Sequence, residues 1–85
     1  MLEVELLSKT ECPLCDKAVA VLEELKRDIP FTLTIIDIYQ DDQLLEEYQI
    51  MIPVVRIGTE EVDFGQISKE KVRKRLLERQ ETKKV

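Results

Sequence analysis

The sequence has no histidine, no tryptophan and only two cysteines. A structural zinc site needs about four ligands, so one copy of the chain cannot supply it, and only a dimer could build a four-cysteine site. No stretch approaches the roughly 20 apolar residues of a transmembrane helix. The N-terminus carries acidic residues where a signal peptide carries basic ones. We therefore expect a cytoplasmic protein with no membrane partner and no bound metal.

The composition favours one globular domain over residues 1–85, because 44% of the residues are hydrophobic and 36% are charged. The net charge of −5 is uneven: residues 1–68 hold 5 basic and 15 acidic side chains, whereas residues 69–85 hold 8 basic and 3 acidic. A basic tail can bind nucleic acid. This tail interleaves glutamates and has no aromatic residue for base stacking, so we expect no nucleic-acid partner. We also expect a monomer.

The two cysteines form a Cys-x-x-Cys pair, Cys12 and Cys15, where a strand-like run gives way to a helix-like run. Pro13 suits the first helical position, which makes Cys12 the N-cap beside the positive end of the helix dipole. We expect this position, with Lys9 nearby, to lower the pKa of the Cys12 thiol. Cys15, one turn later, should be the less exposed sulfur, so Cys12 attacks and Cys15 resolves. A purely structural disulfide is the alternative, although so short a loop removes little chain entropy.

Hydrophobic periodicity predicts the element order β-α-β-α-β-β-α, and hence an α/β fold with a four-stranded mixed sheet and helices on both faces. The expected strands span 2–7, 31–38, 50–57 and 60–64, and the expected helices span 13–27, 41–49 and 69–80. The apolar pair Ile35-Ile36 indicates a strand buried on both faces. Val62 and Phe64 should face inward from the last strand. The last helix should begin at an N-cap Ser68 and bury Val72, Leu76 and Leu77.

The stretch Ser8-Lys9-Thr10-Glu11-Cys12-Pro13-Leu14-Cys15, together with Ile52-Pro53, resembles the glutaredoxin branch of the thioredoxin fold. Leu14-Cys15-Asp16 and Ile52-Pro53-Val54-Val55 are closer still to a group of small glutaredoxin-like proteins found mainly in bacteria. The resemblance spans nearly the whole chain. It implies a cis peptide bond before Pro53, which would lie against the cysteines. It also implies that the backbone of Ile52 pairs with an extended substrate or with glutathione.

The chain departs from the glutaredoxin pattern at two places of the implied substrate site. Leu14 replaces the usual tyrosine, and Gly65-Gln66-Ile67-Ser68 stands where the family has a Gly-Gly-x-Asp-like turn. Ser68 could still offer its hydroxyl and the first amides of the last helix to an anion. The substrate-binding residues implied in this way are Lys9, Pro13, Leu14, Ile52, Pro53, Gly65, Gln66 and Ser68.

The resemblance and the cysteine pair together predict a thiol–disulfide oxidoreductase with no bound cofactor. Its substrates would be protein disulfides or glutathione mixed disulfides. Its electron donor would be glutathione, another low-molecular-weight thiol or a thioredoxin-reductase-like enzyme. The alternative from another class is a non-catalytic thioredoxin-fold module that binds an extended protein strand without turnover.

Overall fold

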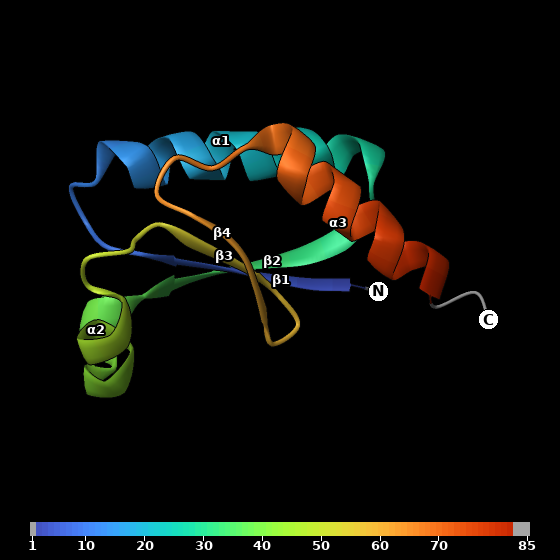
Figure 1. Ribbon diagram of the computed structural model, residues 1–85. Coiled ribbons are helices and arrows are strands. Elements are labelled where there is room, and N and C mark those ends of the chain that lie inside the picture. The colour runs from blue at the N-terminus through green and yellow to red at the C-terminus, as the bar shows by residue number, and fades with distance from the viewer. Residues whose placement is uncertain (1, 83–85) are drawn as a thin grey trace.

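The computed structural model describes residues 2–82, except for the side chains of residues 81 and 82. The elements follow in the expected order (Figure 1). They are β1 (Leu2–Ser8), α1 (Pro13–Asp28), β2 (Phe31–Asp37), α2 (Asp42–Tyr48), β3 (Val54–Ile57), β4 (Glu60–Phe64) and α3 (Lys69–Thr82), with a 3₁₀ turn, Ile38–Gln40, before α2. None of the helices described is long and apolar enough to cross a membrane.

The four strands form one mixed sheet in the order β2-β1-β3-β4. β1 runs parallel to β2 and antiparallel to β3, and β4 pairs antiparallel with β3. Figure 1 shows α1 and α3 on one face of this sheet and α2 on the other. The predicted α/β architecture, with helices on both faces, is therefore confirmed.

The core has one cluster on each face of the sheet. The larger cluster includes Leu22 and Leu25 of α1 and Leu76 of α3, all fully buried against β1 and β3. The helical spacing of these residues gives α1 and α3 one apolar face each, and that face packs on the sheet. The smaller cluster lies beside α2 and joins Tyr48 to Val54. The two central strands are thus covered on both sides.

Two expectations about the strands are wrong. The third strand begins at Val54 rather than at Ile50, because residues 50–53 form a turn that contains a cis peptide bond. Ile35 is 51% exposed rather than buried, because β2 lies at the edge of the sheet. The apolar run at the end of β2 does not therefore mark a central strand.

The expected inward positions of Phe64 and Leu77 are also wrong. A register shift between Val55 and Arg56 leaves Val62 without a cross-strand partner. Val62 packs against the larger cluster as expected, but Phe64 pairs with Val54 on the opposite face and is 57% exposed. Such a bulge breaks the two-residue alternation on which the prediction relied. Leu77 is 38% exposed, whereas its neighbour Leu76 is fully buried.

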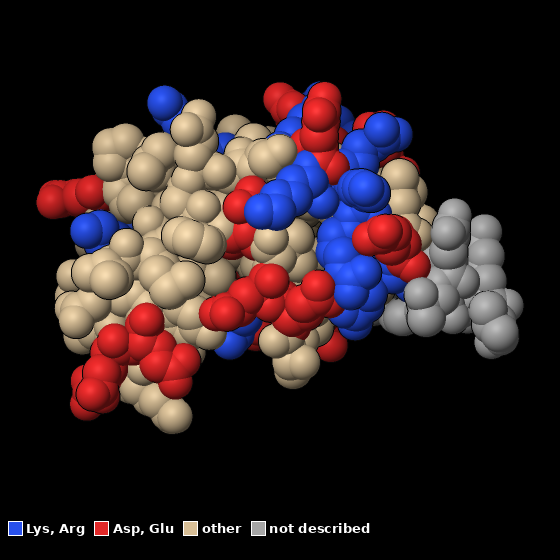
Figure 2. All heavy atoms as spheres, viewed as in Figure 1, with Lys and Arg blue, Asp and Glu red and all other residues tan. Residues whose placement is uncertain are grey.

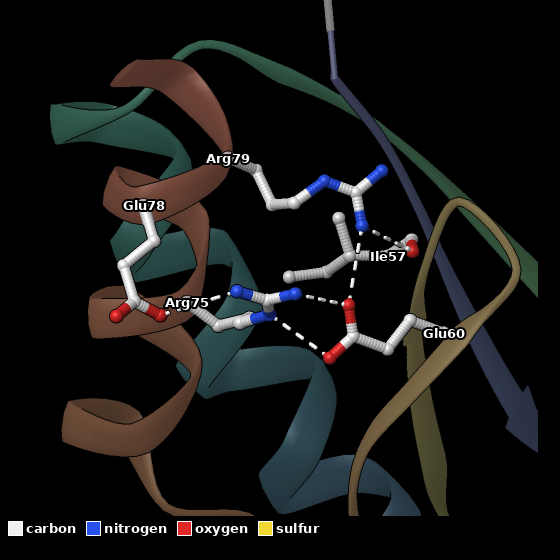
Figure 3. A network of polar contacts seen from close by, with 5 residues as sticks. All are labelled: Ile57, Glu60, Arg75, Glu78 and Arg79. Carbon is white, nitrogen blue, oxygen red and sulfur yellow. Dashed lines mark hydrogen bonds and ion pairs between the residues drawn. The ribbon is translucent and has the colours of Figure 1, made fainter. Parts of the chain in front are cut away.

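An ionic network fixes α3 to the hairpin between β3 and β4 (Figure 3). Both oxygens of Glu60 accept hydrogen bonds from Arg75, with donor–acceptor distances of 2.9 and 2.5 Å. Arg79 reaches Glu60 at 3.3 Å and the carbonyl of Ile57 at 3.4 Å. The hydrogen bonds from Arg75 hold the pKa of the Glu60 carboxyl below its usual value. The C-terminal half of α3 is thereby tied to the sheet.

Candidate active site

The cysteine pair lies where the loop after β1 enters α1. Glu11 takes a φ of +53°, which turns the chain sharply before the helix. Cys12 is the N-cap of α1 with extended backbone angles, and Pro13 occupies the start of the helix, as the sequence predicts. The ring of Pro13 is already close to helical φ and has no N–H to leave unpaired. The sequence at residues 11–13 therefore sets where the first cysteine stands.

The two cysteines are joined by a disulfide, with their Cα atoms 5.1 Å apart. The backbone N–H of Cys15 donates to Sγ of Cys12 at 3.1 Å. Cys12 is 8% exposed and Cys15 is 3% exposed, so the expected order of accessibility is confirmed. The sulfur of Cys12 thus accepts from a backbone donor at the positive end of α1, and Cys12 is the more exposed residue of a buried pair.

A pocket of about 390 Å³ opens beside Cys12. Its lining comes from the cysteine loop, the first turn of α1 and the segment after α2, namely Lys9, Glu11, Cys12, Pro13, Leu14, Gln49, Ile50 and Ile52. The structure therefore brings together Lys9, Pro13, Leu14 and Ile52 of the residues implied by the resemblance. Sequence reasoning missed Ile50, which it assigned to a strand. Its apolar side chain, two positions before Ile52 in the sequence, was the only signal that could have placed Ile50 at the site.

The peptide bond between Ile52 and Pro53 is cis, as the resemblance implies. The carbonyl of Pro53 accepts a hydrogen bond from the amide of Gly65 at 2.8 Å, which brings the turn after β4 next to Pro53. The amide of Ile52 donates to the carbonyl of Tyr48 at 3.2 Å. The backbone N–H of Ile52 is therefore engaged within the chain, and the pairing of the Ile52 backbone with an extended substrate stays a prediction.

The turn from Gly65 to Ser68 is held by Asp63, a residue that sequence reasoning missed. The two oxygens of Asp63 accept from the amides of Ser68 at 2.8 Å and Phe64 at 3.0 Å, and Lys71 Nζ lies 3.5 Å away. Ser68 Oγ accepts from the amide of Lys71 at 3.3 Å, which confirms Ser68 as the N-cap of α3. At the turn that was expected to meet an anion, the Ser68 amide thus binds a carboxylate, and the Lys71 amide of the first helical turn binds Ser68 Oγ. Gly65, Gln66 and Ser68 do not line the pocket beside Cys12.

The fold and the cysteine pair define the class of the protein. The chain has a Cys-x-x-Cys pair at the start of its first helix, a mixed four-stranded sheet and a cis proline before β3. This is the arrangement of a thioredoxin-fold protein with a redox-type site. Thioredoxin 1 from Thermosipho africanus superposes with a TM-score of 0.72 at 14% identity, over 98% of this chain and 99% of that chain. Glutaredoxin 1 from Francisella tularensis superposes with a TM-score of 0.52 at 19% identity, over 95% and 99%.

The family follows from a sequence model. Residues 3–77 match the family described as Glutaredoxin-like domain (DUF836), and the chain belongs to this family. A structural-genomics target protein from X. campestris is also similar, with a TM-score of 0.74 and 24% identity, over 88% of this chain and 96% of that chain. No curated protein is significantly similar in sequence. At these identities the solved structures establish the fold and leave the substrate to be argued from the site.

Proposed function

We propose that this protein is a thiol–disulfide oxidoreductase in which Cys12 attacks and Cys15 resolves. The observation that carries the proposal is the place of Cys12 Sγ: it caps α1, accepts the Cys15 N–H at 3.1 Å and borders a pocket. A backbone donor and a helix N-terminus both stabilise a thiolate over a thiol. The backbone therefore favours the thiolate form of Cys12, and Lys9 of the same pocket adds a positive charge.

The proposed reaction starts from the reduced dithiol. The Cys12 thiolate attacks one sulfur of a substrate disulfide, the substrate S–S bond breaks, and the leaving thiolate takes up a proton. A mixed disulfide now joins Cys12 to the substrate. The Cys15 thiolate then attacks Cys12 Sγ, which releases the second substrate thiol and leaves the Cys12–Cys15 disulfide. Two electrons pass from the protein to the substrate, so no bound cofactor is needed.

The substrates that we propose are protein disulfides or glutathione mixed disulfides. The oxidised pair is re-reduced by glutathione, another low-molecular-weight thiol or a thioredoxin-reductase-like enzyme. Cycling of this kind belongs to a reducing compartment such as the cytoplasm. Both reacting sulfurs come from one chain, so the chemistry needs no second copy.

The test is turnover of one disulfide substrate under two supplies of electrons. One supply is glutathione with glutathione reductase and NADPH, and the other is thioredoxin reductase with NADPH. Cys12→Ser and Cys15→Ser run beside the wild type. We expect Cys12→Ser to abolish turnover with either supply, because the attacking sulfur is lost.

The Cys15→Ser variant identifies the route of the electrons. Turnover with glutathione that survives Cys15→Ser indicates a monothiol step with glutathione. Turnover only with thioredoxin reductase, lost in both variants, indicates a dithiol reductase. Full activity of Cys12→Ser refutes the proposal. Stoichiometric binding of a partner protein without turnover favours the non-catalytic binding module instead.

A further inference from the structure

Two large apolar side chains stand exposed beside the redox pair. Leu14 is 42% exposed and Ile50 is 92% exposed, the largest value among the exposed large hydrophobic side chains of the described residues. Both line the pocket that also contains Cys12. They come from different elements, since Leu14 lies in the first turn of α1 and Ile50 lies just after α2. Exposed apolar residues gathered at a pocket are typical of a surface that a partner covers.

The surface next to Ile50 is acidic. The segment 37–50 holds five acidic residues and no lysine or arginine. Asp37 and Asp41 cap the 3₁₀ turn and α2. Glu46 and Glu47 are exposed, and neither takes part in an ion pair among the described residues. They lie four and three positions before Ile50, so the pocket wall formed by Gln49 and Ile50 directly follows an acidic helix.

The basic residues gather elsewhere. Figure 2 shows a red group over α2 and a blue group over α3, with further red side chains directly beside the blue group. In the pocket beside Cys12 the one lysine, Lys9, is accompanied by Glu11. A basic partner is therefore attracted toward the α2 side, where the redox pocket opens, and is repelled by α3.

We propose that the redox partner is a protein segment with an apolar residue next to its reactive disulfide and lysines or arginines beyond it. This inference rests on the proposed function and names its substrate class. The apolar residue packs between Leu14 and Ile50 while Cys12 reacts with the adjacent sulfur. The basic residues face Glu46 and Glu47 of α2. The exchange of bonds and electrons is the one given above, with the segment supplying the disulfide.

The same features disfavour glutathione as the recognised group. Glutathione carries two carboxylates and one ammonium group, so it approaches the acidic α2 side as an anion. At the turn that was expected to meet an anion, the Ser68 amide is bound by the Asp63 carboxylate at 2.8 Å and the Lys71 amide by Ser68 Oγ at 3.3 Å. A carboxylate of glutathione therefore meets the negative charge of Asp63 at this turn, where two backbone donors are already engaged.

The experiment measures single-turnover reduction of matched peptides by the pre-reduced full chain. Each peptide carries one cysteine in a disulfide with neutral 2-mercaptoethanol. Three peptides share a Leu-Cys core and differ in the residues beyond it, which are Lys in the basic peptide, Ser in the neutral one and Glu in the acidic one. A fourth peptide is the basic peptide with the Leu of the core replaced by Ser. The neutral peptide with glutathione in place of 2-mercaptoethanol tests the competing substrate. Stopped-flow quenching and chromatography give the second-order rate constants.

We expect the basic peptide to react about 10-fold faster than the acidic one at ~0.01 M ionic strength, where the screening length is about 30 Å. The ratio should fall below about 2 at ~1 M salt, where that length is about 3 Å. Glu46→Gln/Glu47→Gln should cut the low-salt ratio to about 3-fold. Ile50→Ser should slow the Leu-core peptide about 5-fold and leave the Ser-core peptide unchanged, in line with the loss of one apolar anchor.

Matched controls carry the same changes away from the pocket. Glu23 is exposed on α1, on the opposite face of the sheet from α2, and Leu77 is exposed on α3. Glu23→Gln and Leu77→Ser should leave all rates unchanged. Equal rates for the four peptides, or fastest reaction of the glutathione mixed disulfide, overturn this inference and leave the oxidoreductase proposal intact. Reduction of none of the disulfides overturns both.

Discussion

The carboxylate of Asp63 should contribute measurably to stability, because it is the acceptor that holds the turn between β4 and α3. Its side chain is 10% exposed and accepts from the amides of Phe64 and Ser68 at 3.0 and 2.8 Å. A buried hydrogen bond to a charged group contributes about 1.5–3 kcal/mol. Phe64 and Ser68 are themselves exposed, so water can replace part of each bond. We therefore expect Asp63→Ala to lower the free energy of unfolding by about 1–2 kcal/mol.

Urea denaturation followed by circular dichroism measures this difference, and an unchanged denaturant slope shows that both variants unfold from the same compact state. For a domain of this size the loss corresponds to a fall in Tm of about 5–15 °C. Asp63→Asn keeps one oxygen acceptor, so it should lose about half as much. The control Asp28→Ala, at an exposed aspartate that ends α1, should unfold within about 0.5 kcal/mol of the wild type.

The reasoning about Asp63 fails on either of two results. One is an Asp63→Ala variant as stable as the Asp28→Ala control, which would mean that water fully replaces the carboxylate. The other is an Asp63→Asn variant as unstable as Asp63→Ala, which would assign the effect to charge alone rather than to the hydrogen-bond acceptor.

Three further predictions concern the sulfurs, the ionic network and the core. In reduced Cys15→Ser protein the Cys12 thiol should titrate below the ordinary thiol pKa of about 8.5, as measured by thiolate absorbance near 240 nm, and an ordinary value would contradict the helix-terminus argument. Hydrogen bonding to Arg75 lowers the pKa of Glu60, so the stability that it contributes is present at pH 7 and is lost as the pH falls through this lowered pKa. Glu60→Gln should therefore unfold at lower urea than the wild type at pH 7, the gap should narrow as the solution is acidified, and a gap of constant size would refute the assignment. Leu76→Ala, at a fully buried position, should lower the free energy of unfolding by about 2–5 kcal/mol, whereas Leu77→Ala should lower it by under about 1 kcal/mol. Thermal or urea unfolding measures both, and similar losses would contradict the observed buried face of α3.

Local patterns were sufficient to predict the order of the elements and the place of Cys12 at the start of α1. Apolar and polar residues alternate in residues 2–7, and apolar residues recur at helical spacing from Pro13 onward. Each pattern indicates which side of one element is buried. Cys12 as N-cap follows from Pro13 alone. The cis bond at Pro53 came from the family resemblance, since local rules favour a trans bond there.

Features that depend on strand order and register were not predictable in this way. Ile35 is exposed because β2 has a neighbour on one side only, which no local pattern records. Phe64 faces outward because of a register shift with β3, more than five residues away in sequence. Asp63 was missed for a related reason: its partner amide at Ser68 is placed by the path of the turn after β4. Ile50 was missed because residues 50–53 looked like the start of a strand.

The cysteine loop and Pro53 are each connected directly to one of the two central strands of the sheet. β1 leads into the cysteine loop, and Pro53 immediately precedes β3, with a strand on each outer side of this pair. Amide hydrogen exchange should therefore be slowest at the backbone groups that anchor the site, because inner strands open only when the whole domain unfolds. A site anchored on these two strands should be lost only when the fold itself is lost.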